Sequence, residues 1–304
     1  MKLRLIRSTI LALAFLLAGA CSRYSLKHEA RRIDTVNNNV CKKLQGEVVL
    51  YCVFVDTRST HPWTDYDIRS TLDSIHRATR WLEQRARASR IPLRIAVRYH
   101  QSKRVIPIAQ NFPSRTLSRT LFTPVLPAGI AKMDRWASAV ARTAGKALPV
   151  DTAVSVRTKN SLADRERLIA RLRDLYKTDN VALMYFVNNY YQDEISVTLH
   201  SGSDEKTEYS VVSFKEPAVV AHEFLHLFGA LDLYISPFDR KRAMRKRKKW
   251  AMQEFPREVM AFAYRRIDSL DISPFTEYLI GWRNEVDATT KQALLGRKIK
   301  LVKY

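Results

Sequence analysis

The hydrophobic positions divide the first hundred residues into alternating strand and helix patterns. Residues 47–56 are an almost unbroken apolar run rich in β-branched and aromatic side chains, which is typical of a buried strand. Residues 64–90 repeat their apolar positions at helical spacing, and Thr64 with Asp67 predicts a capping box at the start. Residues 91–100 alternate apolar and polar positions, as a strand with one wetter face does. Together they predict a βαβ unit with two parallel strands.

Similar patterns continue toward the C-terminus. Residues 101–128 are rich in Pro, Ser, Thr and Arg and predict a long surface excursion. The later apolar patterns predict a helix at 129–147 and a second helix that begins at a cap formed by Ser161 and Asp164. They also predict strands at 180–188, 194–200 and 207–214. Pro217 then marks the first turn of another helix, where its missing N–H costs nothing. Residues 267–282 predict a turn ending at Pro274 and a closing helix that buries Tyr278, Leu279 and Trp282.

The composition indicates a folded protein with an anionic partner. The 304 residues are 46% hydrophobic and 27% charged, which excludes an intrinsically disordered chain. Lys and Arg outnumber Asp and Glu by 52 to 30, so the formal net charge is +22. Such an excess favours contact with nucleic acid, phospholipid or an acidic polymer.

The N-terminus narrows that choice. Residues 1–20 combine a positive start, a short apolar stretch and a small-residue end, which predicts a bacterial secretion signal rather than a membrane span. Cys21 follows directly, so we expect a lipoprotein in which Cys21 is lipidated; an ordinary signal peptide cleaved near Ala20 is the alternative. Residues 21–45 are mostly polar and predict a tether. Export excludes nucleic acid as the partner, and Ser22 after the cysteine favours an outer-membrane anchor facing the periplasm, or the cell surface.

Two further cysteines, Cys41 and Cys52, leave two alternatives open. A disulfide between them is compatible with an oxidising compartment. Alternatively, Cys52 is a small buried hydrophobe, because it lies inside the apolar run 47–56.

The stretch AHEFLHLFGALDLY carries the candidate chemistry. His222 and His226 are four residues apart, so on a helix they lie on one face and can bind one ion. Imidazole nitrogens are common zinc ligands, and a catalytic zinc has three protein ligands and an open position. Glu223 lies next to His222, where its carboxylate can act as a general base on water. We therefore expect one catalytic Zn²⁺ here.

The third ligand is expected to be a carboxylate, because no histidine follows His226. Gly229 suits a sharp turn at the end of the helix, and such a turn can bring Asp232 back toward the histidines. Glu254 and Glu258 are the alternatives, if the ligand comes from a later helix instead.

The pattern H-E-x-x-H-x-x-G-x-x-D resembles the zinc signature of the metzincin metallopeptidases, in the form with an aspartate ligand found in snapalysins. The resemblance implies a zinc endopeptidase with His222, His226 and Asp232 as ligands and Glu223 as the base. It also implies an α/β (α+β) fold: a twisted, mostly parallel sheet with one antiparallel edge strand, and a small C-terminal subdomain. The edge strand, at 194–200, would pair with an extended peptide substrate.

Metzincins also have a methionine turn beneath the metal, and the resemblance assigns this structural role to Met260 in REVMAFAYRR. The sequence departs from some members two residues later, where Phe262 replaces a tyrosine. Tyr264 is the nearest phenol.

We expect residues 46–304 to form one catalytic unit, with an upper part at 46–229 and a lower part at 230–304, acting on a peptide or protein substrate. Two alternatives are a catalytically inert metal-binding scaffold and a zinc hydrolase of cell-wall peptides. Glu223 counts against the scaffold, because a purely structural zinc site has no use for a base.

The run DRKRAMRKRKKW at 239–250 lies between the motif and Met260. We expect it to form a basic loop, residues 240–249, at the lower lip of the cleft. Its charge can orient the protein on a membrane, or it can select acidic substrates.

Overall fold

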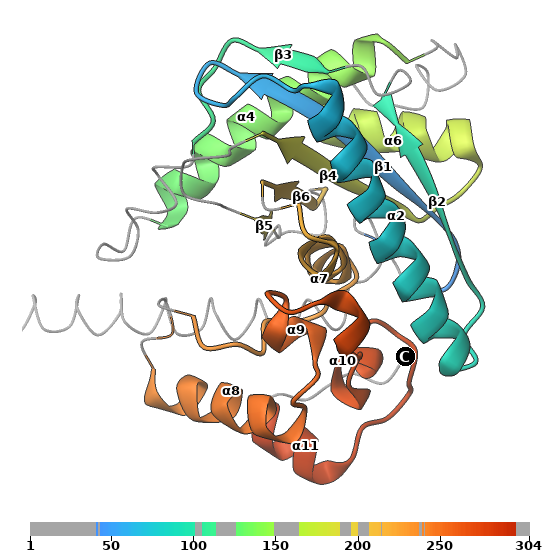
Figure 1. Ribbon diagram of the computed structural model, residues 1–304, viewed down its shortest axis with the longest axis vertical. Helices are drawn as coiled ribbons and strands as arrows, with labels where there is room; N and C mark the ends of the chain where they lie inside the picture. The colour runs from blue at the N-terminus through green and yellow to red at the C-terminus, as the bar shows by residue number, and fades with distance from the viewer. Residues whose placement is uncertain are drawn as a thin grey trace, which may run out of the picture.

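The computed structural model describes residues 41, 43–100, 105–113, 126–148, 164–188, 196–199, 207–213, 215–236, 239 and 241–295. The elements labelled in Figure 1 are β1 (Gly46–Thr57), α2 (Asp65–Ala88), β2 (Leu93–Tyr99), β3 (Ile106–Ile108), α4 (Leu126–Lys146), α6 (Asp164–Tyr176), β4 (Val181–Val187), β5 (Val197–Leu199), β6 (Tyr209–Val212), α7 (Pro217–Leu227), α8 (Arg242–Glu254), α9 (Val259–Phe262), α10 (Pro274–Leu279) and α11 (Ala288–Leu294). A short 3₁₀ helix, Ile267–Ser269, precedes α10. Among the described residues, no helix is long and apolar enough to cross a membrane.

One sheet organises the protein. Its strands follow the order β2-β1-β4-β6-β5, and β3 pairs with the end of β1. The pairs of β1 with β2, β3 and β4, and of β4 with β6, are parallel, whereas β5 runs antiparallel to β6. The prediction of a parallel βαβ unit from β1 to β2 is therefore confirmed. The protein has a mixed α/β fold with a mostly parallel sheet.

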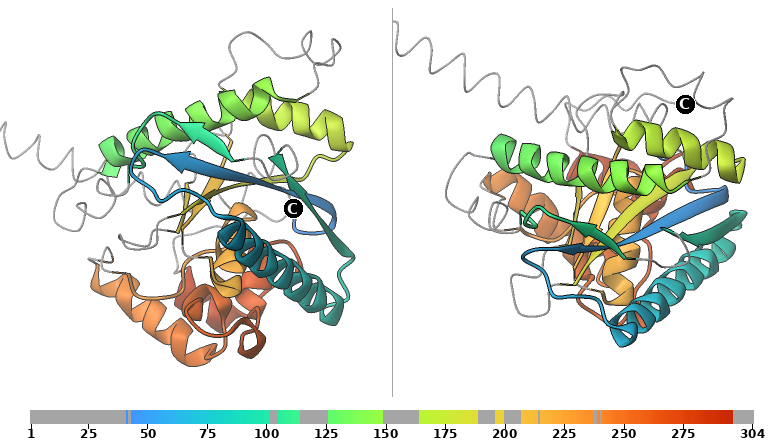
Figure 2. Two further views of the ribbon diagram at one scale, coloured as in Figure 1. Left: turned by 45° about the horizontal axis from the view of Figure 1, so that its top comes forward. Right: turned by 90° about the horizontal axis from the view of Figure 1, so that it is seen from above.

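Alternate residues of β1 enter two different cores. Val48, Leu50, Cys52 and Phe54 pack on the face of the sheet shared with α2 and α7, and Val49, Tyr51, Val53 and Val55 pack on the face covered by α4 and α6. Figure 2 shows α4 and α6 on one side of the sheet and α2 on the other. A strand buried on both faces must be apolar throughout, which explains the unbroken run in the sequence.

The long helix α2 begins as its sequence predicts. The Thr64 side chain accepts a hydrogen bond from the Asp67 amide, and the Asp67 carboxylate accepts one from the Thr64 amide. These bonds satisfy two N–H groups at the helix start. The buried side of α2 includes Leu72, Ile75 and Leu82, so the helix is fixed against the sheet.

Two predictions near the ends of elements need correction, and a third lies outside the described residues. Residues 106–108 of the predicted surface excursion form the edge strand β3, in which Pro107 is exposed and needs no ladder bond. The folded domain begins before residue 46, because Leu44 is fully buried and its N–H bonds to the carbonyl of Ile280. Residues 21–40 of the predicted tether, and the signal 1–20 with Cys21, lie outside the described residues.

The basic run is a helix rather than a loop. Residues 242–254 form α8, since Ala, Met, Arg, Lys and Gln are all good helix formers and the run contains no Gly or Pro. Helix α11, which contacts α8, is not among the elements predicted from the sequence.

The cysteine alternatives are resolved in favour of packing. Cys41 and Cys52 are both buried as free cysteines, and the Cys41 thiol donates to the carbonyl of Val181. Burial raises the pKa of both thiols. Both side chains belong to the core on the α2 side of the sheet, and Cys52 is fully buried there as a small hydrophobe.

Candidate metal centre

Helix α7 carries the histidine motif through the centre of the protein. It begins at Pro217, which occupies the first helical position as predicted, and every one of its residues is buried. The helix lies between the sheet and the short helix α9 (Figure 1), and it packs against α2. A fully buried helix has little freedom to move, so side chains at one face of it are held in fixed positions.

Gly229 ends α7 and turns the chain. Its φ of 94° lies in the left-handed region that glycine adopts easily. The Gly229 amide bonds to the His226 carbonyl at 3.0 Å, and the Ala230 amide bonds to the Leu225 carbonyl at 3.2 Å. This pair of bonds is a Schellman motif, which reverses the chain after the last helical turn. The turn brings Asp232 back beside the histidines.

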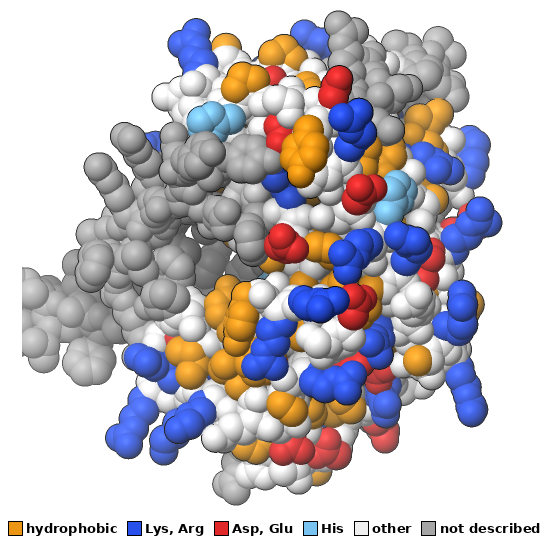
Figure 3. Space-filling view, viewed as in Figure 1, with side chains coloured by type: hydrophobic (Ala, Val, Ile, Leu, Met, Phe, Trp, Pro, Cys, Tyr) orange, Lys and Arg blue, Asp and Glu red, His pale blue; other side chains and the backbone are white. Residues whose placement is uncertain are grey.

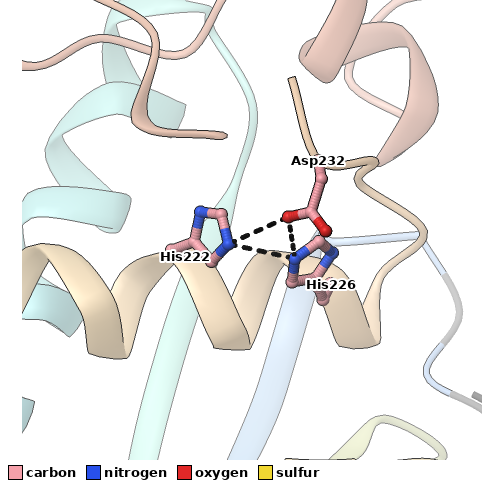
Figure 4. A group of neighbouring side chains, drawn as sticks. All are labelled: His222, His226 and Asp232. Carbon is pink, nitrogen blue, oxygen red and sulfur yellow. Dashed lines mark hydrogen bonds and ion pairs between the residues drawn. The ribbon is translucent and has the colours of Figure 1, made fainter. Parts of the chain in front are cut away.

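Three ligand-type atoms meet at this point. His222 Nε2 and His226 Nε2 are 3.1 Å apart, and Asp232 Oδ1 lies 2.9 Å from His226 Nε2 and 3.2 Å from His222 Nε2. Figure 4 shows the two rings and the carboxylate turned toward one another. In a tetrahedral zinc site with bonds of about 2.0–2.1 Å, ligand atoms are roughly 3.3 Å apart. The observed triangle is slightly tighter than that.

The far nitrogen of each ring is bonded to the backbone. His226 Nδ1 lies 2.8 Å from the Ala230 carbonyl, and His222 Nδ1 lies 3.2 Å from the Val259 carbonyl. A carbonyl accepts only, so each Nδ1 carries the proton and donates it. Neutral rings held in this way direct the Nε2 lone pairs at the centre of the triangle, as metal-binding histidines do.

The triangle is electrostatically incomplete without a cation. Two lone pairs of buried histidines and an oxygen of the partly exposed Asp232 carboxylate face one another, so either a metal ion or a proton must lie between them. Burial lowers the pKa of His222, but the hydrogen bond and charge of Asp232 outweigh it and leave that pKa raised. Burial raises the pKa of Asp232, but the two histidines outweigh it and hold that pKa well below its usual value. The residues present therefore fit a divalent cation with N and O ligands.

Glu223 is held by a polar contact from the edge strand. The Thr198 hydroxyl on β5 donates to Glu223 Oε2 at 2.7 Å, and Ser210 Oγ on β6 lies 2.6 Å from Thr198 Oγ1, where it can donate in turn. Burial raises the pKa of Glu223, while the nearby histidines and the Thr198 bond partly offset the rise. One carboxylate oxygen is thus fixed, while Glu223 also faces the cleft.

A cleft of about 480 Å³ opens beside His222 and Glu223. Apolar side chains provide much of its lining, namely Val219, Ile235, Met252, Ala261 and Ala263. Two phenols, Tyr234 and Tyr264, also line it. The Tyr234 ring lies 6.0 Å from the His222 ring, centre to centre, and Tyr264 is among the most exposed large side chains of the described chain. The cleft can hold an apolar group next to the candidate metal.

Two residues of this site were not predicted from the sequence. Tyr234 lies two residues after Asp232, so its position could have been noticed, but a phenol there belongs to no pattern that we used. Thr198 lies in the strand predicted at 194–200, and only the pairing of β5 with β6 brings it to Glu223.

The segment around Met260 lies against the site, and the rival carboxylates do not. Met260 is fully buried, and its carbonyl accepts a hydrogen bond from the amide of Leu233, next to Asp232. Glu258 is bonded instead to the amides of Met260 and Ser273, and Glu254 is exposed on α8. Among the described residues, the histidines meet only Asp232 as a potential third metal ligand.

When the chain was compared with models of known protein families, with curated proteins and with solved structures, it matched none of them.

Proposed function

We propose that this protein is a zinc-dependent peptidase, with His222, His226 and Asp232 as metal ligands and Glu223 as the general base. The observation that carries the proposal is the convergence of three acceptor atoms within 3.2 Å, with both Nδ1 protons donated elsewhere. That arrangement is costly unless a cation occupies it. Glu223 adds a carboxylate that is not one of the three ligands, which favours catalysis over a structural role.

The reaction divides its tasks between the ion and the chain. A zinc ion held by His222, His226 and Asp232 would lower the pKa of water toward 7 and would polarise the carbonyl that is attacked. Glu223 accepts a proton from water through the carboxylate oxygen that Thr198 leaves available, and then passes it to the leaving amine. The apolar cleft wall beside His222 holds the substrate side chain and reduces access of bulk water.

Several features support a metzincin-like enzyme in particular. The motif H-E-x-x-H-x-x-G-x-x-D lies on and directly after one helix, the sheet is mostly parallel with the antiparallel strand β5 at its edge, and the buried Met260 follows the third proposed ligand beneath the site. Thr198 places β5 directly beside the proposed base. A peptide extended along that edge would therefore pass the candidate metal, which is the substrate orientation we propose.

The first experiment measures zinc and cleavage in the same preparations. Wild-type protein should bind one zinc per chain and cleave members of a peptide library in a reaction that a zinc chelator stops. His226→Ala should lose the metal and the cleavage together. Undiminished zinc in His226→Ala would show that the metal site lies elsewhere.

Glu223→Gln separates the enzyme from the inert scaffold. Glutamine has nearly the same shape but cannot accept a proton from water, so zinc content should stay the same and cleavage should fall by at least about two orders of magnitude. Equal rates for both proteins would contradict the mechanism. If zinc-loaded wild type cleaves only cell-wall peptides, the enzyme is a cell-wall hydrolase, and if it cleaves nothing, the scaffold alternative replaces the peptidase.

A further inference from the structure

A cationic stripe runs along the exposed face of α8. Arg242, Arg245, Lys246 and Lys249 are all exposed, and their spacing of three, four and seven residues places them on one side of the helix. The stripe extends over about 10 Å along the helix axis. Figure 3 shows Lys and Arg side chains projecting at the lower left of the molecule, where Figure 1 places α8.

Among the described residues, no side chain neutralises the stripe. Within the described part of the chain, no acidic side chain lies within ion-pair distance of these four residues. By contrast, Lys248 on another side of the same helix pairs with Asp239 at 3.0 Å. Four like charges at adjacent helical positions repel one another, so they disfavour the helix unless something anionic compensates them.

The position of α8 in the protein is fixed by its other side. Ala251 is buried in the same core as α7, and Arg247 donates to the carbonyl of Leu294 on α11. The stripe therefore keeps a set orientation relative to the rest of the protein. It is a surface of defined shape rather than a loose basic segment.

The same helix borders the candidate active-site cleft. Met252 lines the cleft and follows Arg245 by seven residues, so the two lie on nearly the same side of α8. Lys248 lies over the ring of Tyr234, 5.6 Å from its centre, and Tyr234 also lines the cleft. The stripe thus continues outward from the lower wall of the cleft.

We propose that the cationic stripe of α8 is a docking surface for an anionic phospholipid bilayer. A row of exposed cations along a helix fits a broad charged plane, and none of these four cations is among the side chains that line the cleft. The sequence predicts a lipid on Cys21, which would keep the bilayer at a high effective concentration near the domain. Docking of α8 brings the mouth of the cleft beside the membrane.

Vesicle binding tests this proposal independently of zinc and of cleavage. All proteins carry Cys21→Ser, so that no lipid on that residue contributes. The test variant replaces Arg242, Arg245, Lys246 and Lys249 with Gln, which keeps good helix propensity. Each cation near an anionic surface contributes roughly fivefold to partitioning, so binding to vesicles that contain phosphatidylglycerol should fall by nearly three orders of magnitude, about 600-fold.

A matched control removes the same charge from another surface. Arg69, Arg80, Arg87 and Arg94 are exposed on α2 and β2, and replacing all four with Gln should change vesicle binding far less. Binding of the reference protein should also be weak on phosphatidylcholine vesicles and should decrease in high salt.

Three outcomes would overturn the proposal. In the first, the stripe variant binds anionic vesicles as tightly as the reference protein. In the second, the control variant loses as much affinity as the stripe variant, which would show that net charge alone determines binding. In the third, vesicle binding is unchanged while the KM for acidic peptides rises, which would assign the stripe to substrate selection. If the thermal unfolding temperature and the zinc content are unchanged in both variants, any loss of vesicle affinity is due to the substituted surface and not to misfolding or loss of the metal.

Discussion

At the scale of single residues, the proposed base Glu223 is held by a neighbour that is distant in sequence. The Thr198 hydroxyl donates to Glu223 Oε2 at 2.7 Å, and both groups are buried. A hydrogen bond to a carboxylate in a buried site is short and strong, and it restricts the rotation of the side chain. Thr198 is therefore proposed as a positioning residue, since it acts through Glu223.

Replacing Thr198 tests that role. Thr198→Val keeps the shape but removes the hydroxyl, so kcat should fall by about tenfold or more while KM and zinc content change little. Thr198→Ser restores a hydroxyl and should recover most of the rate. A Val variant as active as wild type, or a Ser variant as impaired as Val, would remove Thr198 from this role. Steady-state kinetics with one peptide substrate provides the measurement.

At the scale of elements, two local features position the chain that follows α7, namely the turn at Gly229 and the hydrogen bonds of Glu258. The Schellman turn at Gly229 directs the chain to Asp232, and the carboxylate of Glu258 joins the start of α9 to the start of α10. A single substitution can weaken each feature, with an expected cost in the free energy of unfolding.

Gly229→Ala should destabilise the protein and reduce its zinc affinity together. An alanine at a φ of 94° is strained by about 1–2 kcal/mol, and relief of that strain displaces the segment leading to Asp232. Gly145→Ala is the matched control, because Gly145 is helical and a Cβ there meets nothing closer than 3.8 Å. The control should gain about 0.4–1 kcal/mol. Denaturant unfolding and zinc titration of both variants measure these effects. Equal zinc affinity in Gly229→Ala and wild type would show that the Gly229 turn is not needed to position Asp232 for metal binding.

Glu258→Gln should cost stability but not zinc. Glu258 accepts from the Met260 amide at 2.9 Å and from the Ser273 amide at 2.5 Å, one bond to each oxygen. An amide side chain can accept only one of them, and its NH₂ then faces an N–H, so we expect a loss of about 1–3 kcal/mol. The exposed Glu254 provides the control, since Glu254→Gln should be neutral. Loss of zinc in Glu258→Gln without loss of stability would reinstate Glu258 as a ligand.

At the scale of the whole molecule, the proposed zinc is also a source of stability. An ion that binds only the folded state stabilises it by RT ln(1 + [L]/Kd), or about 4 kcal/mol at a thousandfold excess over Kd. For a domain of this size, such a loss lowers Tm by on the order of 10 °C. Removing the metal with a chelator should produce this shift in wild type, measured by calorimetry. His226→Ala should unfold at the same temperature with and without the chelator, and a wild type that holds zinc but shows no shift would contradict the prediction.

Much of the fold could be read from local patterns, because each such pattern reports a single element. An apolar run buried on both faces predicted β1 and β4, the capping box predicted the start of α2, and Pro217 predicted the start of α7. The basic run was misjudged for the opposite reason. High charge suggested a loop, although the same residues favour a helix once Ala251 has a core to enter.

The sequence by itself determined the spacing of the candidate site. Two histidines four residues apart on a helix must share one face, whatever surrounds them, and a glycine three residues after the second permits the chain to turn back. The tertiary structure decided which carboxylate joins them, because Asp232, Glu254 and Glu258 were all compatible with the spacing. It also decided that Thr198 holds Glu223, that Tyr234 and Met252 line the cleft, and that the charges of α8 face outward. These relations join residues on different elements, and only the packing of the sheet, α7 and the lower helices brings such residues within contact distance.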